Sequence, residues 1–94
     1  MFIVLLKFGP NKALAPKFMA PHKAWIEQGV ESGIFKIVGS LDAGGGFILA
    51  HGEERSEIEM RVSADPFVQK SIVVPEIYQI DINRVSNDLA WLSK

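Results

Sequence analysis

The segment of residues 2–8 (FIVLLKF) constrains the fold most, because every position in it except Lys7 is apolar. A strand of β-branched and aromatic residues without polar alternation is typical of a sheet covered on both faces. The chain has 94 residues, of which 48% are hydrophobic, and that is more apolar surface than one small domain easily buries. We therefore expect a central strand whose second face is covered by another copy of the chain.

The next part of the chain predicts a helix followed by a hairpin. The helix runs to about residue 32. Either its regular part starts near Pro21 or a kink lies beside His22, because a proline removes a helical donor. Gly33 is a suitable helix stop. Residues 34–41 and 47–50 predict two strands around a flexible turn at residues 42–46 (DAGGG).

A second helix is predicted from residues 56–59 (SEIE), which match the capping box, so this helix should begin at its serine. It should end at residue 64 or 65, because Pro66 disfavours helical backbone in the residue before it. Ile58, Val62 and Asp65 are spaced by four and three and share one face of this helix. The carboxylate of Asp65 is therefore expected near the buried side, and a short turn follows it.

The last strand is expected within residues 71–85. Pro75 limits its first half to a sheet edge or a strand start, and residues 77–83 alternate in strand fashion. Residues 86–94 predict a short helical extension. The order β-α-β-β-α-β defines an α+β, ferredoxin-like fold, an antiparallel sheet with both helices on one face. We expect one domain over residues 1–94 with a core of about 1–85, and a homodimer that pairs two sheets into an α+β barrel.

Composition excludes several classes of function. The net charge of −1, from ten basic and eleven acidic residues, gives no long-range attraction to nucleic acid or anionic membranes. The chain has no cysteine, so disulfides and thiolate chemistry are excluded, which fits a cytoplasmic location. The apolar start is too short to span a membrane and lacks the features of a signal peptide.

Motifs for cofactors and metals are weak. The glycines at residues 44–46 lack the lysine and hydroxyl residue of a phosphate loop. His22 and His51, with Asp42 or Asp65, have the side chains of a two-histidine carboxylate site, but their spacing does not demand one. We expect no metal and no cofactor, and a small molecule as the ligand.

His22 is the residue that gives the most information about function. It lies near the centre of one helical arc with Phe18, Met19, Trp25, Ile26, Gly29 and Val30. Such a histidine either packs in the core with a hydrogen bond to backbone or faces a pocket. Since both helices cover the same sheet face, Asp65 can contact His22. The carboxylate would then raise the basicity of the imidazole, so that His22 could act as a general base. In the alternative, Asp65 only caps the following turn.

The segments PHKAW at residues 21–25 and, above all, ADPFV at residues 64–68 resemble the YCII-related (YciI-like) family, and the resemblance covers roughly residues 1–85. It implies a dimeric ferredoxin-like α+β barrel in which His22 and Asp65 form the catalytic pair. A relative eliminates chloride from a chlorinated hydroxyhydroquinone, and the barrel is similar to that of muconolactone isomerases. This chain departs from the family in three ways: it lacks an arginine shortly before His22, has a proline directly before it, and carries Gly39 and Ser40 in place of a proline-containing turn.

The resulting hypothesis is a cofactor-independent lyase or isomerase, of the dehydrochlorinase or muconolactone-isomerase type. His22 would act as acid or base, oriented by Asp65, on a small oxygenated metabolite, aromatic compounds included. Ser40 and Lys7 are weaker candidates for binding a polar group of the substrate, although small residues near Ser40 also suit a β-bulge. The alternative is a non-catalytic homodimer that binds a small ligand or serves as an accessory subunit.

Overall fold

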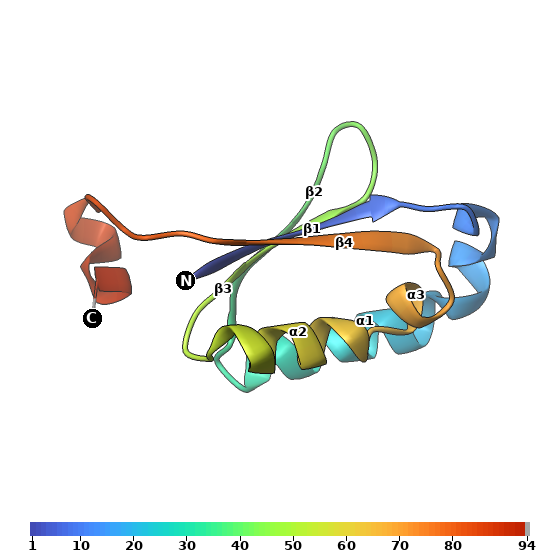
Figure 1. The fold of residues 1–94 in the computed structure, drawn as a ribbon, viewed down its shortest axis with the longest axis horizontal. Helices are drawn as coiled ribbons and strands as arrows, with labels where there is room; N and C mark the ends of the chain where they lie inside the picture. The colour runs from blue at the N-terminus through green and yellow to red at the C-terminus, as the bar shows by residue number, and fades with distance from the viewer. Residues whose placement is uncertain (94) are drawn as a thin grey trace.

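The first strand of the computed structural model, β1 (Phe2–Phe8), lies inside a four-stranded antiparallel sheet of order β2-β3-β1-β4. The structure describes residues 1–93. The other elements are η1 (Lys12–Leu14), α1 (Ala15–Glu31), β2 (Phe35–Ser40), β3 (Gly46–Ala50), α2 (Arg55–Ser63), α3 (Pro66–Gln69), β4 (Val73–Gln79) and η2 (Asn87–Ser93). All three α-helices lie on one face of the sheet, which confirms the predicted ferredoxin-like α+β fold (Figure 1).

The two faces of β1 differ in burial. Phe2, Val4 and Leu6 face the helices and are 0–3% exposed, in a core that includes Ile48, Ile58, Val62 and Phe67. Ile3 and Leu5 point to the opposite face and are only half-buried in the single chain. A strand that is apolar on both sides thus has one side covered by its own helices. What covers the other side stays a prediction.

Strand β4 ends earlier than the alternating pattern predicts. Pro75 lies in this strand at the edge of the sheet, as expected, since an edge position tolerates the missing donor. The last ladder bond joins the Ile80 amide to the Met1 carbonyl at 2.9 Å. Residues 81–85 form no strand, because β1 begins at Phe2 and offers them no partner. The alternation of apolar and polar residues continues past the point where strand pairing stops.

The helix α1 is continuous through Pro21, so the regular helix does not start there as one alternative held. Pro16 occupies the first turn, where a missing donor costs nothing. Pro21 leaves the carbonyl of residue 17 without its helical partner. Lys17 and Pro21 are both exposed, so water can satisfy that carbonyl. The helix tolerates the proline because it lies on the solvent side.

The start of α2 also differs from the prediction. The helix begins at Arg55, and its capping box is formed by Glu54 and Glu57 rather than by Ser56 and Glu59. The Glu54 amide donates to the Glu57 side chain at 2.9 Å. A carboxylate can accept the same amide hydrogen bonds as a serine hydroxyl, so the reciprocal pattern forms two residues earlier.

The predicted C-terminal helix is a kinked 3₁₀ segment, η2, at the end of an extended stretch that carries it away from the helices (Figure 1). Leu92 is buried, whereas Trp91 is 45% exposed with the Lys36 ammonium 5.5 Å from its ring centre. The final predicted position, residue 94, lies outside the described residues. No helix within residues 1–93 has the length and apolar character needed to cross a membrane.

Candidate active site

His22 on α1 and Asp65 at the start of α3 are in direct contact. The distance between His22 Nδ1 and Asp65 Oδ1 is 2.8 Å, although the two residues are 43 positions apart in the sequence. The His22 side chain is 12% exposed and the Asp65 side chain is fully buried. The helical layer therefore brings together the two residues that the sequence paired.

Asp65 is held by its local backbone as well as by the histidine. Its extended conformation makes it the N-cap of α3, and its Oδ1 atom accepts a hydrogen bond from the Phe67 amide at 3.0 Å. Ile58 and Val62 on the preceding helix are buried beside it, as their shared face predicted. Capping and histidine pairing are therefore not alternatives, because one oxygen atom does both.

The contact with Asp65 determines which nitrogen of His22 is free. An ionised carboxylate only accepts hydrogen bonds, so a neutral imidazole that donates to it carries its proton on Nδ1 and has its lone pair on Nε2. Among the side chains of residues 1–92, Asp65 Oδ2 is the only polar atom that is both fully buried and without a partner. Nε2 of His22 has no hydrogen bond to a described residue and is not fully buried, so it is open to the adjacent pocket. Asp65 thus fixes the orientation of the imidazole from the side away from the pocket, and a histidine held in this way is able to exchange a proton with a bound molecule.

Aromatic rings fix the plane of the imidazole. The Phe67 ring stacks on His22 with 3.8 Å between ring centres and an angle of 4° between planes. Trp25 lies on α1 with its ring centre 6.0 Å from that of His22. Because Phe67 directly follows the Asp65-Pro66 turn, one short segment supplies both the carboxylate and the stacking ring.

Trp25 is in turn tied to α2. Its Nε1 donates to the Arg61 carbonyl at 2.9 Å, and its ring meets Phe35 edge-on. The Arg61 guanidinium makes a two-point contact with Glu53, at 2.9 and 3.0 Å. Hydrogen bonds from Arg61 lower the pKa of Glu53, and the same carboxylate raises the pKa of Arg61. This arrangement fixes α1 against α2 behind the histidine.

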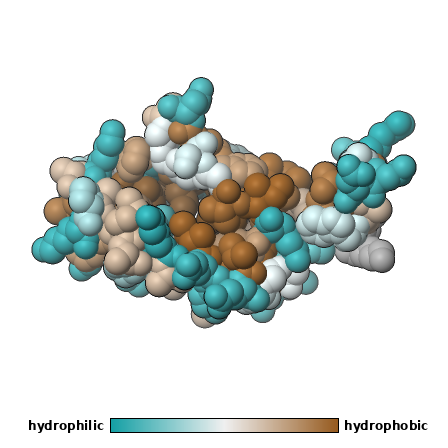
Figure 2. Space-filling model, turned by 180° about the vertical axis from the view of Figure 1, so that it is seen from behind, coloured by the Kyte–Doolittle hydropathy of each residue, from teal (hydrophilic) through white to brown (hydrophobic). Residues whose placement is uncertain are grey.

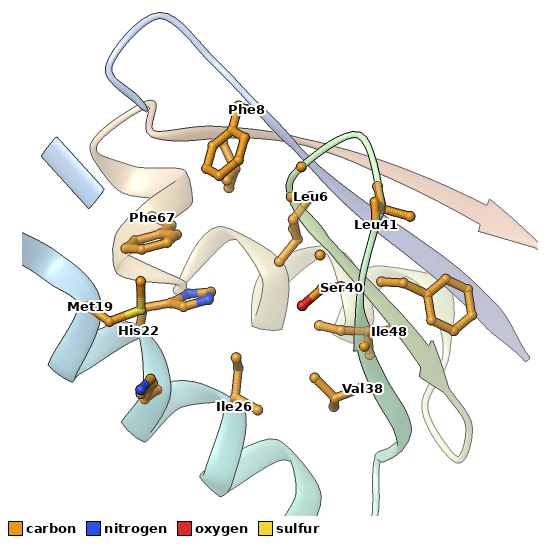
Figure 3. A pocket seen from close by; sticks show the side chains of 17 residues that line it. Leu6, Phe8, Met19, His22, Ile26, Val38, Ser40, Leu41, Ile48 and Phe67 are labelled. Atoms are coloured by element: carbon orange, nitrogen blue, oxygen red, sulfur yellow. The ribbon is translucent and has the colours of Figure 1, made fainter. Parts of the chain in front are cut away.

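His22 lines a cavity of about 490 Å³ between α1 and the β2–β3 hairpin. Most of its lining is apolar, including Leu6 of β1, Ile26 of α1 and Val38 of β2. In Figure 3 the His22 imidazole and the Ser40 hydroxyl enter this space from opposite sides. Figure 2 shows hydrophobic surface gathered at the middle of the molecule below the projecting hairpin. A volume in this range and a mostly apolar lining are compatible with binding of a small molecule.

Glycines in the hairpin turn close one end of this cavity. Gly44 and Gly45 have φ angles of +97° and +95°, which other residues rarely adopt. A Cβ atom on Gly45 would lie 2.2 Å from the Leu6 carbonyl, so the turn packs directly on β1. The glycine cluster therefore contributes to the shape of the pocket.

The structure brings Ser40 to the pocket but not Lys7. Side chains alternate along β1, so Leu6 faces the cavity and Lys7 faces the other side of the sheet, where it pairs with Glu76 at 3.2 Å. Gly39 and Ser40 line the cavity, and the register irregularity of β2 lies between Phe35 and Ile37, away from Ser40.

Two residues of the pocket were not predicted from the sequence. Lys23 lines the cavity beside His22, and Phe67 both lines it and stacks on the imidazole. The sequence signal for Phe67 is its position directly after the Asp65-Pro66 pair. On the predicted inner arc of α1, Met19 lines the cavity together with His22, whereas Val30 is 50% exposed and does not line it.

A metal site formed by the two histidines is not assembled. His51 follows β3, and it is not among the residues that line the His22 pocket. Among residues 1–93, no group of three or more histidine, cysteine, aspartate or glutamate side chains is placed to hold a metal ion.

Fold and site together define an α+β protein of ferredoxin-like topology with a carboxylate-oriented histidine at an apolar pocket. No family model matches the chain, and no curated protein matches its sequence. Seven chains of solved structures match its fold. One is 5-chloro-2-hydroxyhydroquinone dehydrochlorinase from Burkholderia phenoliruptrix AC1100, in complex with 2,5-dihydroxybenzoquinone. The two folds superpose with a TM-score of 0.68 and 16% sequence identity, over 86% of this chain and 94% of the dehydrochlorinase.

Proposed function

We propose that this protein is a YciI-like lyase or isomerase that needs no cofactor and transfers a proton on a small oxygenated metabolite, aromatic compounds included. His22 is the general acid or base, and Asp65 orients it. The observation that carries the proposal is the 2.8 Å contact between His22 and a fully buried carboxylate, with the second ring nitrogen open to a pocket. Since the chain has no cysteine, the proposal includes a cytoplasmic location.

The chemistry follows from the tautomer. The lone pair of His22 Nε2 takes a proton from a substrate carbon next to a carbonyl or a leaving group. The positive charge that forms on the imidazole is stabilised by Asp65 across the Nδ1 hydrogen bond. Loss of the leaving group then gives elimination, and return of the proton to another carbon gives isomerisation. A positioned acid or base of this kind contributes about 10²- to 10⁴-fold in rate.

The fold comparison is consistent with this chemistry. The matched dehydrochlorinase acts on a chlorinated hydroxyhydroquinone and was solved with a benzoquinone ligand. An apolar cavity with few polar groups suits a ring compound of that size class. Ser40 is the proposed hydrogen-bonding partner of a substrate oxygen. Lys7 has no such role in the proposal, because its ammonium is paired on the opposite face.

Deuterium exchange tests the mechanism even while the natural substrate is unidentified. Small hydroxylated aromatic compounds and lactones would be incubated with the protein in heavy water, and deuterium incorporation followed by NMR. We expect His22→Asn to reduce exchange at least about 100-fold while the unfolding temperature stays near that of the wild type. His51→Asn is the matched control and should retain exchange, since His51 lies outside the pocket lining. Equal exchange by His22→Asn and wild type would refute the mechanism.

The same experiment separates catalysis from simple binding. If wild-type protein binds these compounds in the pocket but never exchanges or converts them, the chain is a ligand-binding or accessory protein.

We also propose that the open face of the sheet pairs with a second copy. That face carries the half-buried Ile3 and Leu5 of β1 and Leu49 of β3, and Tyr78 of β4 is 51% exposed. Sedimentation should show a dimer at micromolar concentration that Leu5→Glu dissociates. Met60→Glu is the control, because Met60 is 75% exposed on α2 and should not affect the dimer. A wild-type monomer would rule out the barrel.

A further inference from the structure

Lys23 is the charged residue of the candidate pocket. It follows His22 on α1, and both side chains line the same cavity. Of the lining residues that the structure describes, Lys23 alone carries a full charge at neutral pH, and no aspartate or glutamate is among them. Lys23 is also exposed, so a ligand in this cavity meets one positive charge at the edge of the cavity.

The ammonium of Lys23 has no ionic partner in the described part of the chain. The described ion pairs join Lys7 to Glu76, His22 to Asp65, Arg55 to Glu59 and Arg61 to Glu53. The cavity walls beside Lys23 are apolar, including Ile26 one turn further along the helix. Lys23 is solvated on its exposed side, and the low-polarity walls on its other side strengthen its attraction for an opposite charge.

A second lysine, Lys12 of η1, lies close to a residue that lines the pocket. The Lys12 ammonium lies 4.7 Å from the centre of the Phe8 ring, which lines the cavity. Asp65 is the acidic group in contact with the site, but it is fully buried behind the imidazole and hydrogen-bonded to it.

We propose that the pocket selects small anionic molecules, with an apolar or aromatic body in the cavity and a negatively charged oxygen at Lys23. The oxygen belongs to a carboxylate or to an ionised phenol or enol, which share this chemistry. Lys23 is then the specificity-determining residue of the site. The assignment of the cavity as a substrate site rests on the proposed function, whereas the preference for an anion rests on the placement of Lys23.

Binding of matched probes tests the proposal. Benzoate would be compared with its neutral analogue benzamide, and 4-nitrophenolate with nitrobenzene, by two-dimensional NMR at low salt. The amides of Gly39, Gly44 and Gly46 report on the pocket, since these glycines line it. We expect at least one anion to bind about 5-fold or more tightly than its neutral analogue, as one partly exposed charge pair allows. The probe pair with the larger preference identifies the kind of oxygen anion.

Variants assign the preference to Lys23. Lys23→Gln should abolish the preference for the anion, and Lys23→Arg should retain most of it. Lys17→Gln is the matched control, because Lys17 lies on the same helix, is not among the lining residues, and has its ammonium over the Phe18 ring. Equal loss in Lys17→Gln and Lys23→Gln, equal affinity of wild type for anion and neutral analogue, or no probe binding at the pocket would overturn the proposal.

His22→Asn separates this inference from the proposed function. A variant that loses exchange but keeps the anion preference supports both proposals. Anion preference in a wild-type protein that catalyses no exchange supports Lys23 and counts against the catalytic role. Catalysis that depends on His22 without any anion preference supports the catalytic role and counts against the role of Lys23.

Discussion

Substitution of Asp65 tests the pairing that organises the site. Asp65→Ala removes the acceptor of two hydrogen bonds, from His22 Nδ1 at 2.8 Å and from the Phe67 amide at 3.0 Å. The imidazole can move its proton to Nε2, which faces the pocket, but the Phe67 amide stays buried without a partner. A buried unsatisfied group costs about 1–3 kcal/mol and a lost charged hydrogen bond costs about 1.5–3 kcal/mol. Removing a buried carboxylate offsets part of this loss, so we expect about 2–4 kcal/mol of destabilisation.

Asp65→Asn provides the matched comparison. Its side-chain oxygen keeps both donors, and its amide nitrogen replaces Oδ2, which already lacks a partner. The charge is lost and the amide nitrogen becomes a buried donor without an acceptor, so we expect about 1–2 kcal/mol of destabilisation. Each kcal/mol corresponds to about 4–8 °C in the unfolding temperature of a domain this size. Thermal and urea unfolding would measure the difference, with the exposed Asp81→Ala as a control within about 0.5 kcal/mol of wild type. If Asp65→Ala is as stable as Asp65→Asn, the two hydrogen bonds do not hold the site as inferred.

Three further substitutions test the surroundings of the site. Phe67→Leu keeps the position apolar but removes the ring stacked on the imidazole, and unfolding should show a loss of about 0.5–1.5 kcal/mol beyond the area effect. Gly29→Ala would place a Cβ atom 2.2 Å from the Phe35 ring and should destabilise the fold by about 1–3 kcal/mol; an unchanged melting curve would contradict the close approach of α1 to β2. Glu53→Gln removes the two-point contact with Arg61, at a cost of roughly 1 kcal/mol at neutral pH. The folded-state pKa of Glu53 lies below its ordinary value of 4.5, so this contribution is complete above that value and disappears as pH falls through the folded pKa. A stability difference that stays constant into strong acid would argue against it.

Local patterns were sufficient to predict much of the fold. The apolar run of β1 has the predicted bounds of Phe2–Phe8, and Pro75 lies on an edge strand. Helix boundaries were predicted less well, because two capping boxes overlap in residues 54–59 and the cap that forms uses glutamates. The end of β4 depends on where its partner strand begins, and no local pattern contains that information.

The sequence by itself determined that a histidine on the inner side of one helix and an aspartate before a proline on another would lie on the same side of a sheet. Helical spacing and element order are enough for that, because they depend only on local geometry and chain connectivity. The tertiary structure decided the rest: that Asp65 contacts His22 directly, that Phe67 stacks on the ring, and that Lys23 and Ser40 share its cavity while Lys7 does not. These relations depend on how the β2–β3 turn packs against β1 and how α3 packs against α1. Contacts between residues far apart in the chain are fixed by the packing of whole elements, and no short stretch of sequence specifies it.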